Sequence, residues 1–156
     1  AEDGIRDVER SRGLGDVYKR QVCKDPNRDS SCILIVEKDV DLENIEKANV
    51  YNGQYFVLGG AFSPLDIKPS KKLRFKQLFE RIKSEAGSGS GLKEIILATS
   101  ATAEGDNTAL YIERILEPLI KKHGLKLTRF GRGLSTGTEL EYSDAATIRN
   151  ALENRK

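Results

Sequence analysis

The segment LATSATAEGDNTALYI at residues 97–112, together with CILIVEKDVD at residues 32–41, decides the fold. Each belongs to a short apolar run, CILIV in one and EIILA in the other, which is typical of a strand buried on both faces of a sheet. The first run ends in a carboxylate, Glu37, whereas hydroxyl groups follow the second, among them Ser100 and Thr102. In parallel α/β sheets the functional crevice lies at the carboxyl ends of the strands. We therefore expect Glu37 and Ser100 at that crevice.

Strand-like and helix-like segments alternate along the chain. The expected strands are residues 32–37, 54–58, 93–99 and 126–130. The expected helices are one shortly after Glu37 and three at residues 71–85, 107–122 and 145–152. Between them lie turn-rich loops, a flexible connector at 86–91 and a Gly-rich loop with a short strand at 131–144. This alternation predicts an α/β fold in which helices flank a mostly parallel sheet.

The apolar residues of these helices predict which sides face the core. In the first helix these are Val40, Ile45 and Ala48, with Asp39 or Asp41 as the N-cap. The second carries apolar residues at helical spacing: Phe75, Leu78, Phe79 and Ile82. The third carries a longer set: Ala109, Ile112, Leu116, Leu119 and Ile120. Pro118 lies inside that set and should kink the helix or end its first part.

Composition narrows the class of protein. The chain has 156 residues, of which 38% are hydrophobic and 32% charged, so it can bury the core of one ordinary domain. It contains no apolar run near the ~20 residues that a membrane helix needs. The net charge is only +2, so any contact with nucleic acid requires a local basic patch. Two cysteines do not make a disulfide framework, which favours a reducing compartment.

Residues 1–21 lack the hydrophobic pattern that the rest of the chain shows. The chain contains no methionine, and residues 1–21, AEDGIRDVERSRGLGDVYKRQ, have no apolar periodicity. DVYKRQ at residues 16–21 also resembles the translation of a transposon-end adapter used in sequencing libraries. We therefore expect a fragment whose residues 1–21 are non-native or disordered, so that the expected fold begins at or after Val22.

The strand ends resemble the Toprim domain of topoisomerases, primases and repair nucleases. In that family a glutamate closes the first strand, an Asp-x-Asp pair closes a later one, and the acids hold Mg²⁺. Glu37 matches the glutamate, and Glu104 with Gly105 matches the Glu-Gly that follows the pair. Ser100 and Thr102 stand where the two aspartates belong. The resemblance implies a Toprim-type (Rossmann-like) fold that has lost its metal-dependent chemistry.

Four blocks, in order, resemble more narrowly the RecR family of recombination mediators. They are Cys23 with DPNRD at 25–29, VLGGAFSPLD at 57–66, LATSATAEGDNTALYI at 97–112 and TRFGRGLSTGTELEYSDAATIRNAL at 128–152. The resemblance implies a zinc-finger remnant at 22–30, a Toprim domain at 31–130 and a C-terminal segment at 131–156. Cys23 is then the last of four zinc ligands, and one thiolate cannot form a tetrahedral site. Zinc is thus expected in the full-length relative and no cofactor in this chain, which also lacks the family's N-terminal helix-hairpin-helix.

The same resemblance implies a role in DNA repair without catalysis. A relative of this kind scaffolds recombinase loading on gapped single-stranded DNA, together with RecO- and RecF-type partners. The full-length relative is expected to form a tetrameric ring and to be bacterial, cytoplasmic and nucleoid-associated. The candidates for contact with partners or DNA are Glu37, Lys38, Glu104, Arg129 and Arg132.

Several residues keep a second interpretation. Glu37 is interpreted as a contact residue, with capping of a helix or pairing with Arg129 as the alternative. For Arg129 and Arg132 a contact role and pairing with Glu139 or Glu141 are equally favoured. The basic residues between 71 and 76, Arg74 among them, are interpreted as a solvated helix face, with phosphate contact as the alternative.

Two other functions remain open from the residues alone. One is a divergent nuclease or primase-type domain that uses Glu37, Glu104 and Asp106 with Mg²⁺. Residues two apart on a helix point to different sides, which makes Glu104 and Asp106 a poor replacement pair. The other is a nucleotide-binding α/β module.

Overall fold

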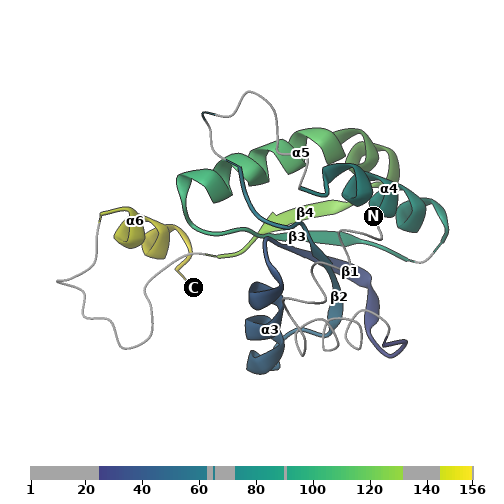
Figure 1. Ribbon diagram of the computed structural model, residues 1–156, viewed down its shortest axis with the longest axis horizontal. Coiled ribbons are helices and arrows are strands. Elements are labelled where there is room, and N and C mark those ends of the chain that lie inside the picture. The colour runs from purple at the N-terminus through teal and green to yellow at the C-terminus, as the bar shows by residue number, and fades with distance from the viewer. Residues whose placement is uncertain (1–24, 63–64, 66–72, 90, 132–144, 156) are drawn as a thin grey trace, which may run out of the picture.

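Four parallel strands form the centre of the computed structural model, which describes residues 25–62, 65, 73–89, 91–131 and 145–155 (Figure 1). The strands are β1 (Asp29–Val36), β2 (Gly53–Val57), β3 (Glu94–Ala98) and β4 (Lys126–Arg129). Their order in the sheet is β2-β1-β3-β4, and every pair of neighbours is parallel. The helices are α3 (Asp39–Ala48), α4 (Phe75–Gly87), α5 (Ala103–His123) and α6 (Ala145–Glu153). The predicted α/β fold with a mostly parallel sheet is confirmed.

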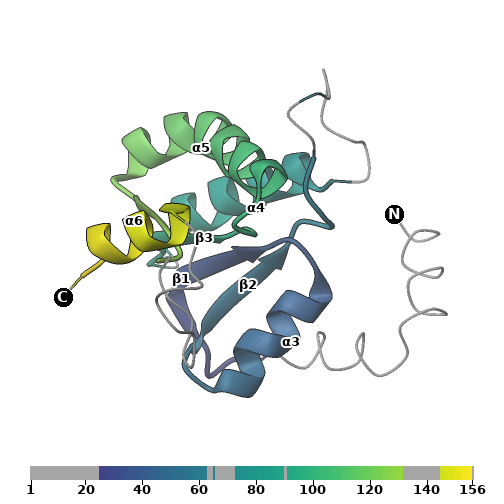
Figure 2. The same cartoon turned by 90° about the vertical axis from the view of Figure 1, so that its left-hand side faces the viewer.

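Helices cover the two faces of the sheet unequally. Figure 2 shows α3 on one side of the strands and both α4 and α5 on the other. Alternate residues of β1 supply both layers: Ile33 and Ile35 belong to the larger core under α4 and α5, whereas Leu34 and Val36 belong to the smaller core with α3. Burial on both faces explains why the strand reads as a continuous apolar run. No residue of α6 belongs to either core, and α6 lies to one side of the layers (Figure 1).

The α3 helix corrects part of the sequence prediction. Leu42 is its buried residue and Ile45 packs beside it, but Val40 is 60% exposed and Ala48 is exposed as well. Val40 points outward because two residues correspond to about 200° of rotation from Leu42. The N-cap position is Lys38, and the predicted capping role falls to Asp41, whose Oδ2 accepts the Lys38 N–H at 3.0 Å.

The α5 helix is longer than predicted at its amino end. It begins at Ala103 instead of residue 107, because Thr102 is its N-cap and the Thr102 Oγ1 accepts the Gly105 N–H at 3.0 Å. Pro118 does not end it: Leu116 before it and Leu119 after it are buried, and the helix continues to His123. The α4 helix begins at Phe75, with Phe75, Leu78 and Ile82 buried as predicted.

A part-buried ion pair links the residue before β1 to α3. The Arg28 side chain is 8% exposed and that of Glu46 on α3 is 15% exposed, and their two contacts are 2.5 and 3.3 Å. Arg28 also donates from Nε to the Gly53 carbonyl at 2.7 Å, and its guanidinium lies 5.2 Å from the centre of the Tyr55 ring. The Tyr55 hydroxyl donates to Glu46 at 2.6 Å. The two charges are therefore paired with each other and bonded to polar groups, as burial requires.

Among the helices of the described ranges, none is both long enough and apolar enough to cross a membrane.

Candidate functional site

The carboxyl ends of β1 and β3 are joined by Glu37 and Ser100. Glu37 follows β1 directly and is only 5% exposed. Its Oε1 accepts the backbone N–H of Ser100 at 2.7 Å, and its Oε2 accepts the Ser100 hydroxyl at 3.0 Å. Both carboxylate oxygens thus bind one residue of the loop after β3. The structure brings together the two residues that the sequence placed at the crevice.

The end of β2 joins the same edge through its backbone. The Gly59 N–H donates to the Glu37 carbonyl at 2.8 Å, and the Leu58 N–H donates to the Val36 carbonyl at 2.9 Å. Gly59 has φ 105°, a conformation that L side chains rarely adopt. The Gly pair at the end of β2 therefore adopts a backbone conformation that suits glycine, beside Glu37 at the end of β1.

The first turns of α5 fix the loop that leaves β2. Thr108 is buried, and its Oγ1 accepts the Phe62 N–H at 3.1 Å while donating to the Glu104 carbonyl at 2.8 Å. The Phe62 ring packs edge-on against Phe75 and Tyr111, with centroids 5.7 and 5.4 Å away. The loop is therefore anchored to α5 through Phe62, next to the strand ends.

Ser100 is held from its other side by α5. A Cβ atom at Gly105 would lie 2.0 Å from the Ser100 carbonyl oxygen, so only glycine allows the helix to approach this closely. The loop between β3 and α5 is thus fixed by three contacts: the Glu37 carboxylate, the Thr102 cap and the bare backbone of Gly105. Gly105 and the Glu37–Ser100 bonds are features that the strand and helix patterns did not reveal.

The carboxylate oxygens near the carboxyl ends of β1 and β3 do not form a site that fits a Mg²⁺ ion. Mg²⁺ requires about six oxygen ligands in octahedral geometry. The oxygens of Glu37 accept from Ser100, and Glu104 and Asp106 lie in the first turn of α5 at i and i+2. Within the residues that the structure describes, no three His, Cys, Asp or Glu side chains form a group that could hold a metal. The set Glu37, Glu104 and Asp106 is not assembled as a ligand cluster.

The remaining candidates are dispersed. Lys38 and Glu104 are exposed, at the start of α3 and of α5 respectively. Arg129 forms an exposed ion pair with Glu113 of α5, with contacts of 2.7 and 2.8 Å. The alternative in which Glu37 pairs with Arg129 is therefore wrong, because each has a different partner. Arg132 and Cys23 lie outside the described residues, as do Glu139 and Glu141.

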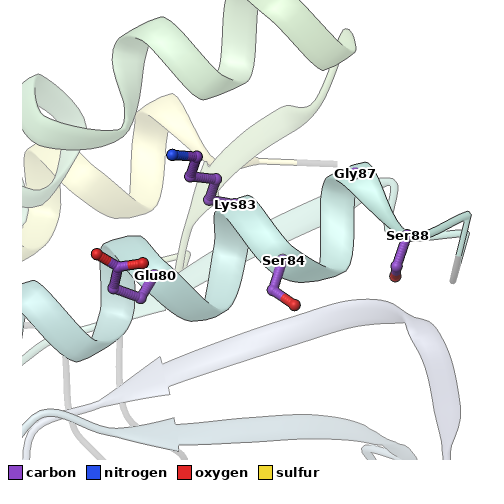
Figure 3. Close-up of a pocket in the computed structure, with 5 residues that line it drawn as sticks. All are labelled: Glu80, Lys83, Ser84, Gly87 and Ser88. Atoms are coloured by element: carbon purple, nitrogen blue, oxygen red, sulfur yellow. The ribbon is translucent and has the colours of Figure 1, made fainter.

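A shallow hollow on α4 carries no site chemistry. Figure 3 shows its lining, which comes from one helix and its cap: Glu80, Lys83, Ser84, Gly87 and Ser88. It lies at the end of α4 that leads to the start of β3, away from the carboxyl ends of the strands. Glu80, Lys83 and Ser84 are exposed, so the hollow offers only solvated groups.

Ser100→Ala should lower the free energy of unfolding by about 1–3 kcal/mol, because it leaves the buried Glu37 Oε2 without its hydroxyl donor. Urea unfolding followed by circular dichroism measures this loss. Ser84→Ala, on the exposed side of α4, is the control and should change stability by less than about 0.5 kcal/mol. Equal effects of the two substitutions would contradict the assigned role of Ser100.

Comparison with known protein families and characterised sequences shows which proteins this chain is similar to. Residues 31–131 match the Toprim domain family, and residues 133–156 match the family described as RecR, C-terminal. The chain is 40% identical over 135 residues to "Recombination protein RecR" of Lactiplantibacillus plantarum, covering 86% of this chain and 64% of the relative. It is 44% identical over 134 residues to the protein of that name from Chloroherpeton thalassium, covering 86% of this chain and 63% of the relative. The chain thus spans somewhat less than two thirds of the length of these relatives.

Proposed function

This chain belongs to the RecR family, and from that premise we propose that it acts in DNA recombination and repair as a scaffold that performs no covalent step. The observation that carries the proposal is the use made of Glu37. In a catalytic Toprim domain this glutamate serves the metal site, whereas here its carboxylate accepts two hydrogen bonds from Ser100. The carboxyl ends of β1 and β3, where a catalytic relative would hold Mg²⁺, are joined here by hydrogen bonds within the protein.

The proposed partners follow from the family resemblance. They are RecO- and RecF-type repair proteins and gapped single-stranded DNA, with recombinase loading as the outcome and a tetrameric ring as the assembly of the full-length relative. Zinc belongs to that relative, where Cys23 would be the last of four ligands. The proposed location is the bacterial cytoplasm, in association with the nucleoid.

The proposed contact surface is the exposed part of the strand-end face. Lys38 and Glu104 are exposed there, Lys38 next to the buried Glu37 and Glu104 four residues after the exposed Ser100. Arg129 is exposed but paired with Glu113, so contact with a phosphate requires exchange of one anionic partner for another. Arg132 remains a proposed contact residue from the sequence. Glu37 itself is proposed to act through the loop that it holds, since its side chain is buried.

A cleavage assay separates the scaffold from the nuclease alternative. Supercoiled plasmid and gapped duplex DNA are incubated with the protein and Mg²⁺ or Mn²⁺, and the expected result is no nicking above buffer. Metal-dependent nicking that disappears in Glu37→Ala but persists in Glu117→Ala would contradict the proposal. Glu117 is a suitable control because it is an exposed carboxylate on α5, paired with Lys121.

Binding to gapped DNA, titrated by fluorescence anisotropy at several salt concentrations, tests the same proposal from the binding side. Phosphate contacts release counterions, so log affinity should fall linearly with log salt, by about 0.7–0.9 per contacted phosphate. Free nucleotide at equal concentration should not compete. Tight nucleotide binding without DNA binding would favour the nucleotide-binding alternative.

A further inference from the structure

The β2 strand forms one edge of the sheet, where backbone groups face away from the other strands. The Leu58 N–H donates inward, to Val36 on β1. Because successive residues of a strand alternate in direction, Gly53, Tyr55 and Val57 direct their carbonyl groups outward. An outward row of carbonyls on an edge strand is a template on which another chain can add a strand.

Each of these three carbonyls accepts a hydrogen bond from a different arginine. Arg28 Nε donates to the Gly53 carbonyl at 2.7 Å, Arg81 Nη1 donates to that of Tyr55 at 2.8 Å, and Arg74 Nη1 donates to that of Val57 at 3.3 Å. The donors therefore follow the period of the strand, one at every second residue. We refer to Arg28, Arg74 and Arg81 as the edge arginines.

The edge arginines reach the strand from both faces of the sheet. Arg28 comes from the side of α3, where Glu46 fixes its guanidinium. Arg74, the N-cap of α4, and Arg81, within α4, lie over the Phe56 ring, 4.9 and 5.9 Å from its centre. Glu85 accepts from Arg81 Nε at 2.9 Å. Each guanidinium is thus held by further contacts besides its carbonyl, so none is a loose surface charge.

The opposite edge of the sheet, β4, differs. There the Lys126 and Phe130 N–H groups donate inward, to Lys93 and Leu97, which directs Leu127 and Arg129 outward. Within the described part of the chain no side chain donates to the carbonyl of either residue. Among the described residues, donation by arginine to outward carbonyl groups is therefore found along β2 and not along β4.

We propose that the edge arginines close the β2 edge to strand addition, so that neither a second copy nor an extended partner segment pairs with β2. An incoming strand needs the outward carbonyls as acceptors for its own N–H groups. It would have to displace three hydrogen bonds from charged guanidinium groups, which are stronger than neutral hydrogen bonds. This inference does not rest on the proposed role in DNA repair, because it concerns the outward carbonyl groups of β2 and not the residues proposed for contact.

The test uses a double variant, Arg74→Leu with Arg81→Leu, and sedimentation velocity over a range of protein concentrations. Leucine keeps apolar contact with Phe56 but cannot donate to the carbonyls. We expect self-association beyond that of the unaltered protein, tighter by about tenfold for each carbonyl released. Hydrogen exchange of amides in residues 53–57 should slow as the larger species forms.

The matched control is Arg114→Leu with Arg149→Leu, on exposed positions of α5 and α6, which makes the same change in charge and apolarity. It should sediment as the unaltered protein does. A folded double edge variant with unchanged sedimentation and exchange would overturn the proposal, as would equal association of the control. If the double variant does not fold, Arg74→Leu alone decides, because Arg74 is exposed and makes the longest of the three bonds. Unchanged sedimentation of that folded single variant would overturn the proposal too.

Discussion

Gly105→Ala should lower the free energy of unfolding by about 2 kcal/mol or more, although alanine favours a helix over glycine by about 1 kcal/mol. The added Cβ would lie 2.0 Å from the Ser100 carbonyl oxygen and 2.8 Å from its carbon, both backbone atoms of a fixed loop. The loop cannot move away without losing the two Glu37 bonds, because they bind the same residue. One methyl group therefore disturbs α5, the Thr102 cap and the joined strand ends together.

Gly87→Ala provides the matched control. Gly87 is also helical, at the end of α4, but a Cβ there meets no atom within 4 Å. That substitution should leave stability unchanged or raise it by up to about 1 kcal/mol. Urea unfolding of both variants measures the difference. A Gly105→Ala protein as stable as Gly87→Ala would show that α5 does not approach Ser100 as closely as described.

The sheet was predictable because its strands are buried on two faces. Continuous apolar runs such as Ile33–Val36 have no other stable location in a domain of this size, and their alternation with helical periodicity indicates parallel pairing. The start of α5 was missed because the residues before 107 are polar and small. Their helical state depends on one hydroxyl, that of Thr102, and on the fit of Gly105 against Ser100, which are tertiary facts.

The site was predictable in position but not in bonding. The sequence places Glu37 and Ser100 at the same edge, since both follow buried strands, yet it does not indicate that one residue satisfies both carboxylate oxygens. Long side chains were predicted least well. Arg74 was interpreted as part of a solvated face; it is exposed, but it also donates to the Val57 carbonyl, which the sequence did not indicate. Arg129 pairs with Glu113, 16 residues earlier. Such side chains reach several ångströms, so their partners depend on the folded arrangement.

Arg28→Ala is expected to have the largest effect of any charge removal considered, a loss of about 3–5 kcal/mol in the free energy of unfolding. The substitution leaves Glu46 charged at a position where its side chain is 15% exposed, with only the Tyr55 hydroxyl as a remaining donor. It also removes the donor to the Gly53 carbonyl. Denaturant unfolding at neutral pH measures the loss.

The pH dependence of stability tests whether the Arg28–Glu46 pair causes the loss expected in Arg28→Ala. Burial raises the pKa of Glu46, but bonds from Arg28 and Tyr55 outweigh it, so the pKa lies below its ordinary value of 4.5. A lowered folded-state pKa gives stability that is present above the ordinary value and is lost as the pH falls through the folded-state pKa. Without Arg28, burial dominates and protonation of Glu46 favours folding. The gap between the unaltered protein and Arg28→Ala should therefore narrow as the pH is lowered from 7 through this range.

Arg129→Ala is the matched control, because Arg129 pairs with Glu113 in a similar geometry but with side chains 38% and 34% exposed. An exposed pair contributes about 0.2–1 kcal/mol, so this variant should lose little. Adding Glu46→Gln to Arg28→Ala removes the uncompensated buried charge and should restore part of the lost stability. If Arg28→Ala costs no more than Arg129→Ala, or if Glu46→Gln restores nothing, the segment before β1 is not held to the sheet by this pair. The expected result is a large loss in Arg28→Ala that the added Glu46→Gln partly restores. Arg28→Ala and the double variant differ only in the charge of residue 46, so the restored stability measures the cost of desolvating the unpaired Glu46 carboxylate.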